Sequence, residues 1–166
     1  MKLENFKKKY FLFVILLFII VLLPSKIFAA SIKASSVDSI SGGDTTIINI
    51  YLDTENEQIN SLDGFLVLSD ENSGNFEIKD LSIVNSVFTI WPNKPSLEDG
   101  HKIKFVAGVP GGVSGEHLLV FKIIAKINKK GNFKIAPNNL IAYLNDGLPT
   151  PRIIDKEVSV IKIGSA

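Results

Sequence analysis

From residue 30 onward, short apolar runs alternate with clusters of Gly, Asn, Asp and Pro, and this punctuation is the strongest constraint on the fold. Residues 45–52 read TTIINIYL, rich in β-branched side chains, and the polar run DTENEQ follows them. No segment of this region keeps a helical period. Many short strands separated by turn residues predict an all-β domain, a two-sheet jelly-roll sandwich of about nine strands.

The expected strands follow from the same pattern. They cover residues 31–40, 45–52, 59–68, 76–84, 86–91, 102–107, 116–127, 131–135, 140–144 and 152–163. The Pro- and Gly-punctuated residues 92–100 are expected to form a loop. Residues 108–115 (GVPGGVSG) are also expected to form a loop, because consecutive glycines weaken a strand interior.

The N-terminus has a different character, which predicts export. Three lysines (7–9) precede the unbroken apolar run FLFVILLFIIVLL at 11–23, and Pro24 and small residues follow it. This order predicts a signal peptide over 1–29 and a single domain over 30–166, located outside the cell or in the cell envelope. The alternative is an uncleaved membrane anchor at 11–23. A helix of that length would reach only about 20 Å, against about 30 Å of hydrocarbon.

Charge and cysteine content exclude several classes of function. Residues 1–29 hold five of the 18 basic residues and one of the 17 acidic ones, so the remainder has 13 and 16, a net charge of −3. A mildly acidic domain without a basic cluster is not typical of nucleic-acid binding. The chain has no cysteine, which removes thiol nucleophiles, thiolate metal sites and disulfides, so the core alone must hold the domain together.

The order of several weak motifs resembles the cohesin-type domain, within a superfamily that also includes bacterial carbohydrate-binding β-sandwiches. The segments are 59–68 (INSLDGFLVL), 86–91 (SVFTIW), Pro95, 100–105 (GHKIKF), 108–115 (GVPGGVSG), 118–126 (LLVFKIIAK) and 140–147 (LIAYLNDG). The resemblance implies a jelly roll that binds a partner and performs no chemistry. In cellulosomal cohesins that partner is a calcium-loaded dockerin module. The resemblance transfers no individual binding residue to this chain.

The functional expectation is therefore a non-catalytic cohesin-like module that binds another exported protein through one sheet face. The alternative is a carbohydrate-binding module for a soluble glycan, with exposed aromatic rings stacking on sugar faces. The candidate ligand-binding residues for that alternative are Trp91, Asn93, Tyr51 and Tyr143. The competing interpretation is that Trp91 packs against the core and the tyrosines hydrogen-bond within the sandwich. No membrane contact is expected beyond the N-terminal segment.

No catalytic residue, metal ligand or cofactor is predicted. The two histidines, His101 and His117, open strands and lie near no nucleophile-elbow pattern. The run DENSGN at 70–75 would need a glutamate at position 81 to match an EF-hand loop, and Leu81 stands there. A loosely bound calcium ion remains an alternative, with ligands drawn from Asp53, Glu55, Asn56, Glu57 and Asp146.

Overall fold

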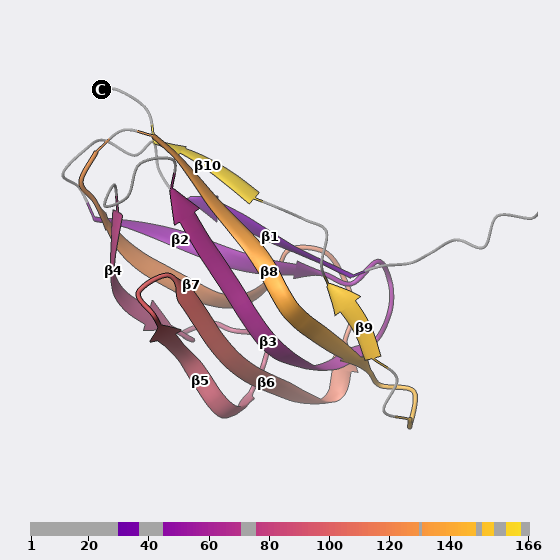
Figure 1. Ribbon diagram of the computed structural model, residues 1–166. Helices are drawn as coiled ribbons and strands as arrows, with labels where there is room; N and C mark the ends of the chain where they lie inside the picture. The colour runs from indigo at the N-terminus through magenta and orange to yellow at the C-terminus, as the bar shows by residue number, and fades with distance from the viewer. Residues whose placement is uncertain are drawn as a thin grey trace, which may run out of the picture.

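A computed structural model describes residues 30–36, 45–70, 76–129, 131–148, 151–154 and 159–163, and these form two β-sheets packed face to face (Figure 1). The predicted all-β, two-sheet fold is confirmed. The expected signal peptide or anchor at 1–29 lies outside the described residues and stays a prediction. Among the residues described, no helix is long and apolar enough to cross a membrane.

The four-stranded sheet has the order β1-β2-β7-β4, with every neighbouring pair antiparallel. Its strands are β1 (Ser31–Ser36), β2 (Thr45–Asp53), β7 (Leu118–Ile127) and β4 (Phe76–Ser82). Along β2, buried side chains alternate with less buried ones, which is the period-2 pattern of a strand covered on one face.

The six-stranded sheet has the order β10-β8-β3-β6-β5, and β9 pairs with β8 on the same edge as β10. Its strands are β3 (Ile59–Asp70), β5 (Ile90–Glu98), β6 (Lys102–Val113), β8 (Gly131–Leu144), β9 (Pro151–Ile154) and β10 (Ser159–Ile163). Strands β3, β6 and β8 are long and central, so they form a broad surface on the side that faces away from the other sheet (Figure 1).

The core lies between the inner faces of the two sheets. Phe105 of β6 and Phe121 of β7 are fully buried and meet edge to face, with ring centroids 5.1 Å apart. Phe76 of β4 and Phe133 of β8 make a second edge-to-face contact between the sheets. At the β1–β10 side, the Ser159 hydroxyl accepts a hydrogen bond from the Ala34 amide at 2.8 Å. The sheets are thus joined by apolar packing along their length and by a polar contact at one margin.

Two predicted loops are wrong in extent. Residues 92–98 belong to β5, whereas residues 86–89, expected as strand, precede it. Pro92 and Pro95 are tolerated because β5 is an edge strand, where a missing N–H costs no ladder hydrogen bond on the open side. Strand β6 continues through Gly108 to Val113. Its glycines are accommodated because β6 bulges between the pairs Ser61–Gly108 and Ile59–Val113, and Gly111 and Gly112 take positive φ there.

The last predicted strands also differ from the observed ones. Residues 131–135 and 140–144 form one strand, β8, which bends at a bulge opposite Gly64. The predicted strand at 152–163 is observed as β9 and β10, and residues 155–158 between them lie outside the described part of the chain. The expected first strand is seen as far as Ser36.

Candidate binding face

The outer face of the six-stranded sheet is built from side chains in register across its strands. Since side chains alternate between faces, the partners of each outward residue also point outward. The resulting rows are Ile90, Gly108, Ser61, Tyr143 and Pro151; Asn93, Val106, Asp63, Ile141 and Ile153; Ser96, Lys104, Phe65 and Asn138; Glu98, Lys102, Val67 and Ala136; and Ser69, Lys134 and Val160.

Near the middle of this face, two lysines of β6 lie over one aromatic ring of β3. The Nζ atom of Lys102 is 3.8 Å from the Phe65 ring centroid, and that of Lys104 is 5.8 Å away. Such cation–π contacts are worth about 0.5–1 kcal/mol at exposed sites. We call Phe65, Lys102 and Lys104 the lysine–phenylalanine cluster. It holds two ammonium groups in place next to an apolar ring.

Apolar side chains continue from this cluster toward both edges of the sheet, β5 on one side and β9 on the other. Ile90 is 51% exposed and Ile153 is 66% exposed. Val106 and Ile141 lie in the same row as Ile153, one on each side of Asp63, and Ile90 lies at the β5 edge of the next row. Exposed aliphatic groups of this kind gain free energy when a partner covers them, at about 25 cal/mol per Å².

The outer face of the four-stranded sheet differs in carrying two ion pairs. Lys33 of β1 contacts the Asp53 carboxylate at 3.2 Å, and Lys79 contacts Glu77 of the same strand at 2.7 Å. Ile47 and Ile124 form a small apolar pair between these charges. The six-stranded sheet therefore presents the more extensive apolar surface.

The four predicted ligand-binding residues do not form one group. Asn93 and Tyr143 lie on the outer face of the six-stranded sheet, three strand spacings or about 14 Å apart. Tyr51 lies on the four-stranded sheet, with its ring 6.0 Å from that of His117. Trp91 is half-buried against the core, and its indole N–H donates to the Phe88 carbonyl at 3.1 Å.

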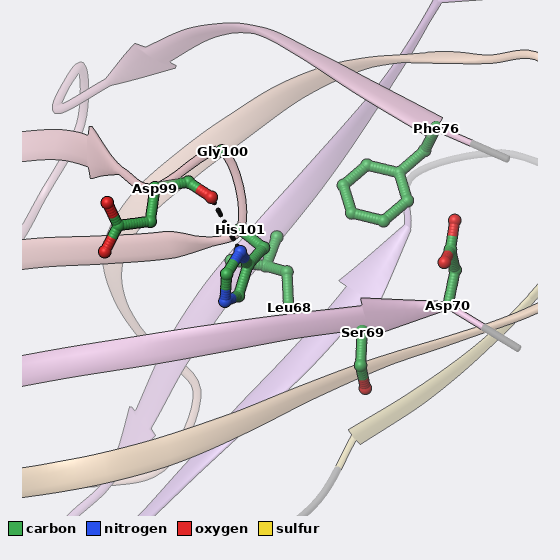
Figure 2. A pocket seen from close by; sticks show the side chains of 7 residues that line it. All are labelled: Leu68, Ser69, Asp70, Phe76, Asp99, Gly100 and His101. Carbon is green, nitrogen blue, oxygen red and sulfur yellow. Dashed lines mark hydrogen bonds between the residues drawn. The ribbon is translucent and has the colours of Figure 1, made fainter. Parts of the chain in front are cut away.

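A polar pocket of about 450 Å³ opens at the end of the sandwich near the β5–β6 turn (Figure 2). Its lining residues are Leu68, Ser69, Asp70, Phe76, Asp99, Gly100 and His101. The Nδ1 atom of His101 lies 2.7 Å from the Asp99 carbonyl oxygen. The backbone carbonyl of His101 accepts a hydrogen bond from the Leu68 amide. These contacts hold the turn against the end of β3, so they have a structural role.

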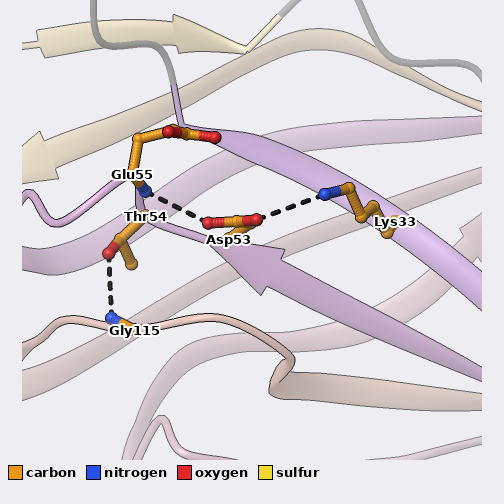
Figure 3. A network of polar contacts seen from close by, with 5 residues as sticks. All are labelled: Lys33, Asp53, Thr54, Glu55 and Gly115. Carbon is orange, nitrogen blue, oxygen red and sulfur yellow. Dashed lines mark hydrogen bonds and ion pairs between the residues drawn. The ribbon is translucent and has the colours of Figure 1, made fainter.

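A polar network fastens the end of β2 at the opposite end of the sandwich (Figure 3). Thr54 is fully buried, its hydroxyl accepts from the Gly115 amide at 3.0 Å, and its own amide donates to the Gly115 carbonyl. Burial alone would raise the pKa of the Asp53 carboxyl. The hydrogen bond from the Glu55 amide and the ion pair with Lys33 outweigh that effect and hold this pKa below its usual value.

The residues named for a loosely bound calcium ion are partly engaged in other contacts. Asp53 belongs to the network above, and Glu57 accepts a 3.1 Å hydrogen bond from Arg152 of β9. In the part of the chain that the structure describes, no group of three or more His, Asp or Glu side chains could hold a metal ion.

Sequence reasoning missed the lysine–phenylalanine cluster. The strict alternation of residues 102–107 (KIKFVA) places Lys102 and Lys104 on the face opposite Ile103 and Phe105. In the same way Phe65 and Val67 alternate with the buried Leu66 and Leu68. These signals assign each residue to a face. They do not say which strands are neighbours, and the cluster needs β3 beside β6.

Comparison with solved structures places this fold among cohesin modules. A cohesin module from a Clostridium perfringens family 33 glycoside hydrolase matches with a TM-score of 0.62 at 11% identity, covering 84% of this chain and 99% of that one. A non-cellulosomal cohesin from the archaeon Archaeoglobus fulgidus matches with a TM-score of 0.60 at 19% identity, covering 82% and 92%. A third match is the third ScaB cohesin of Ruminococcus flavefaciens, solved in complex with a group 1 dockerin, with a TM-score of 0.53 at 12% identity and coverage of 86% and 100%.

No protein-family model matches the chain, and neither does any curated protein sequence. The structural matches nevertheless span nearly the full length of the cohesin modules. The domain therefore has the cohesin fold, and the expected resemblance is confirmed at the level of the fold.

Proposed function

We propose that this chain is an exported, non-catalytic module that binds a dockerin-type protein partner through the outer face of its six-stranded sheet. The cohesin fold supports the class, since its structural neighbours are binding modules and one of them is solved with a dockerin. The signal-like segment at 1–29 supports a place outside the cell or in its envelope.

The observation that carries the choice of surface is the arrangement of rows on that face. Phe65, Val67 and Val106 lie side by side near its middle, and Ile90 and Ile153 lie toward its edges. Protein interfaces typically combine an apolar, aromatic-containing centre with a polar rim. Asn93 and Tyr143 belong to this face and are assigned here to the rim of the interface.

The test is direct binding of the full chain, in mild detergent because of its apolar N-terminus, to a panel of calcium-loaded dockerin modules. We expect at least one module to bind, and Phe65→Ala to weaken it by tenfold or more, because truncating a central aromatic anchor costs about 2 kcal/mol. Biolayer interferometry measures the affinities. Tyr51→Ala, which removes an aromatic ring from the opposite face, is the matched control and should leave binding unchanged.

A panel of soluble glycans tests the carbohydrate-binding alternative in the same preparation. Trp91 is the only tryptophan, so its fluorescence reports on one place in the molecule. Because its indole N–H is bound to the Phe88 carbonyl, we expect no sugar to change the emission. A saturable change with one glycan, together with no dockerin binding, would replace the proposed function with sugar recognition.

A further inference from the structure

We propose that the partner surface is acidic: a helix with carboxylates at positions i and i+4 would place them over Lys102 and Lys104 while its apolar side chains cover the neighbouring aliphatic rows. This inference rests on the proposed function and specifies the chemistry of the partner at the same face. Its basis is the charge of the lysine–phenylalanine cluster and the geometry that holds it.

The charge on this part of the face is unbalanced. Lys102, Lys104 and Lys134 all project from neighbouring outward rows, and two acidic side chains lie near them: Glu98 at the β5 edge and Asp63 in the row next to Lys104. The Glu98 carboxylate is 4.0 Å from the Lys104 Nζ atom, at the limit of an ion pair, and both side chains are more than 40% exposed. A pair of that kind contributes little. With three lysines and two carboxylates this part of the face keeps a net charge of +1, which an acidic partner would meet favourably.

The two ammonium groups are also positioned before any partner arrives. Both lie over the Phe65 ring, at 3.8 Å and 5.8 Å from its centroid. Two like charges near one ring repel each other, and the weak attraction of the ring only partly offsets this. A pair of carboxylates would relieve the repulsion, and the partner would pay less side-chain entropy because the lysines are already ordered.

The spacing of the lysines fits a helix. Residues two apart on a strand are separated by about 7 Å, and side chains at i and i+4 on a helix lie about 6 Å apart at their Cβ atoms. Carboxylates in that register would therefore reach Lys102 and Lys104 together. The apolar residues between them on the helix face would contact Val67, which pairs with Lys102 in the register, and Val106, which lies in the row next to Lys104.

The experiment compares two kinds of probe against the full chain. One is the calcium-loaded dockerin panel, sorted by whether a surface helix carries acidic pairs at i and i+4. The other is a stapled helical peptide with two glutamates at that spacing around a leucine, together with its Glu→Gln counterpart. We expect acidic dockerins and the glutamate peptide to bind preferentially, with an affinity that falls by about tenfold on raising the salt from low to physiological or higher concentration.

The variant Lys102→Gln/Lys104→Gln should weaken both acidic probes by about tenfold and remove the salt dependence. Lys122→Gln/Lys126→Gln is the matched control, since it removes the same charge from the four-stranded sheet, and it should leave both probes unaffected. Thermal unfolding of each variant checks that the fold is retained.

The outcomes separate this inference from the proposed function. The acidic-partner inference alone would be overturned by dockerins whose binding depends on Phe65 but whose affinity is unchanged by Lys102→Gln/Lys104→Gln and by the salt concentration. A glutamate peptide that binds with lysine dependence while no dockerin binds would overturn the dockerin assignment and support the acidic chemistry. Self-association of the chain that blocks this face and is abolished by Phe65→Ala would overturn both.

Discussion

Asp53 and Thr54, adjacent at the end of β2, are two buried polar side chains that stabilise the same region of the domain through different contacts. Thr54 has no charge and satisfies the Gly115 amide through its hydroxyl, which joins the β2 end to the loop before β7. Asp53 keeps its charge because the Glu55 amide and Lys33 both favour the carboxylate. Each polar atom is paired, so the junction avoids the cost of about 1–3 kcal/mol for an unsatisfied buried group.

Asp53 gives a prediction about pH. Its pKa is lowered on folding, so its contribution to stability is fully present above the ordinary value near 3.9 and is lost as the pH falls through the lower folded value. Asp53→Asn should reduce the unfolding free energy at pH 7 by about 1 kcal/mol or less, because Lys33 is half-exposed. It should also flatten the loss of stability below pH 4.

Urea unfolding from pH 7 to pH 2 measures this effect. Lys33→Met is the companion variant, since it removes the ion pair and leaves the Glu55 contact, and it should flatten the same acid limb in part. A wild-type and an Asp53→Asn curve that fall in parallel below pH 4 would contradict the assignment.

At the scale of elements, the close approach of β3 to β8 depends on one glycine. The β3–β8 register shifts between Asp63 and Phe65, and Asn139 of β8 takes a positive φ of 49° at this bulge. Gly64 lies opposite, with a φ of 149°, and a Cβ added there would lie 2.4 Å from the Asn139 carbonyl oxygen. The bulge therefore requires glycine at this position, and it sets which β8 side chains join the outer rows.

Gly64→Ala should lower the unfolding free energy by about 3 kcal/mol, because it combines an unfavourable φ with a backbone clash in a central strand. Gly100→Ala is the matched control. Gly100 also has a positive φ, of 72°, but a Cβ there meets nothing within 4 Å, so the loss should be about 1 kcal/mol. Chemical denaturation of both variants measures the difference, and equal losses would show that the bulge can relax.

At the scale of the whole molecule, the face on which an aromatic side chain lies decides its role. Inward-facing rings stabilise the sandwich, and outward-facing rings are available for binding. Phe105 and Phe65 occupy paired strands of one sheet, and Gly64, next to Phe65, is the register partner of Phe105. Phe105 points inward and contacts Phe121 of the other sheet, whereas Phe65 points outward beneath two lysines. The inner ring joins the sheets, and the outer ring is available to a partner.

Truncating the Phe105 ring should therefore mainly reduce stability, and truncating the Phe65 ring should mainly reduce binding. Phe105→Ala should cost about 3–5 kcal/mol of unfolding free energy, because it leaves a cavity between the sheets. Phe65→Ala should cost less than about 1 kcal/mol while weakening partner binding. Urea midpoints of the two variants measure this, and a large stability loss for Phe65→Ala would place that ring in the core in solution.

Much of the fold could be predicted from local pattern, and the candidate face only in part. Alternation and turn residues predicted the strands at 45–52, 59–68 and 116–127 close to their observed bounds. Pro92, Pro95 and the glycines at 108–112 misled the same reasoning, because an edge strand and a bulge tolerate residues that a central regular strand excludes. Asn93 and Tyr143 stay predicted ligand-binding residues, and the sequence did not show that they share a sheet face.

Three properties can be read from the amino-acid sequence without the folded structure: the all-β class, the alternation of inward and outward side chains, and the order of motifs that resembles cohesins. These properties are local, since they depend on the period-2 geometry of each strand and on the turn residues between strands. The position of β3 between β6 and β8, which brings Phe65 beneath Lys102 and Lys104, is known from the strand pairing of the folded domain and not from the sequence. Pairing between strands distant in the chain is set by the packing of the whole core, so no single segment contains it.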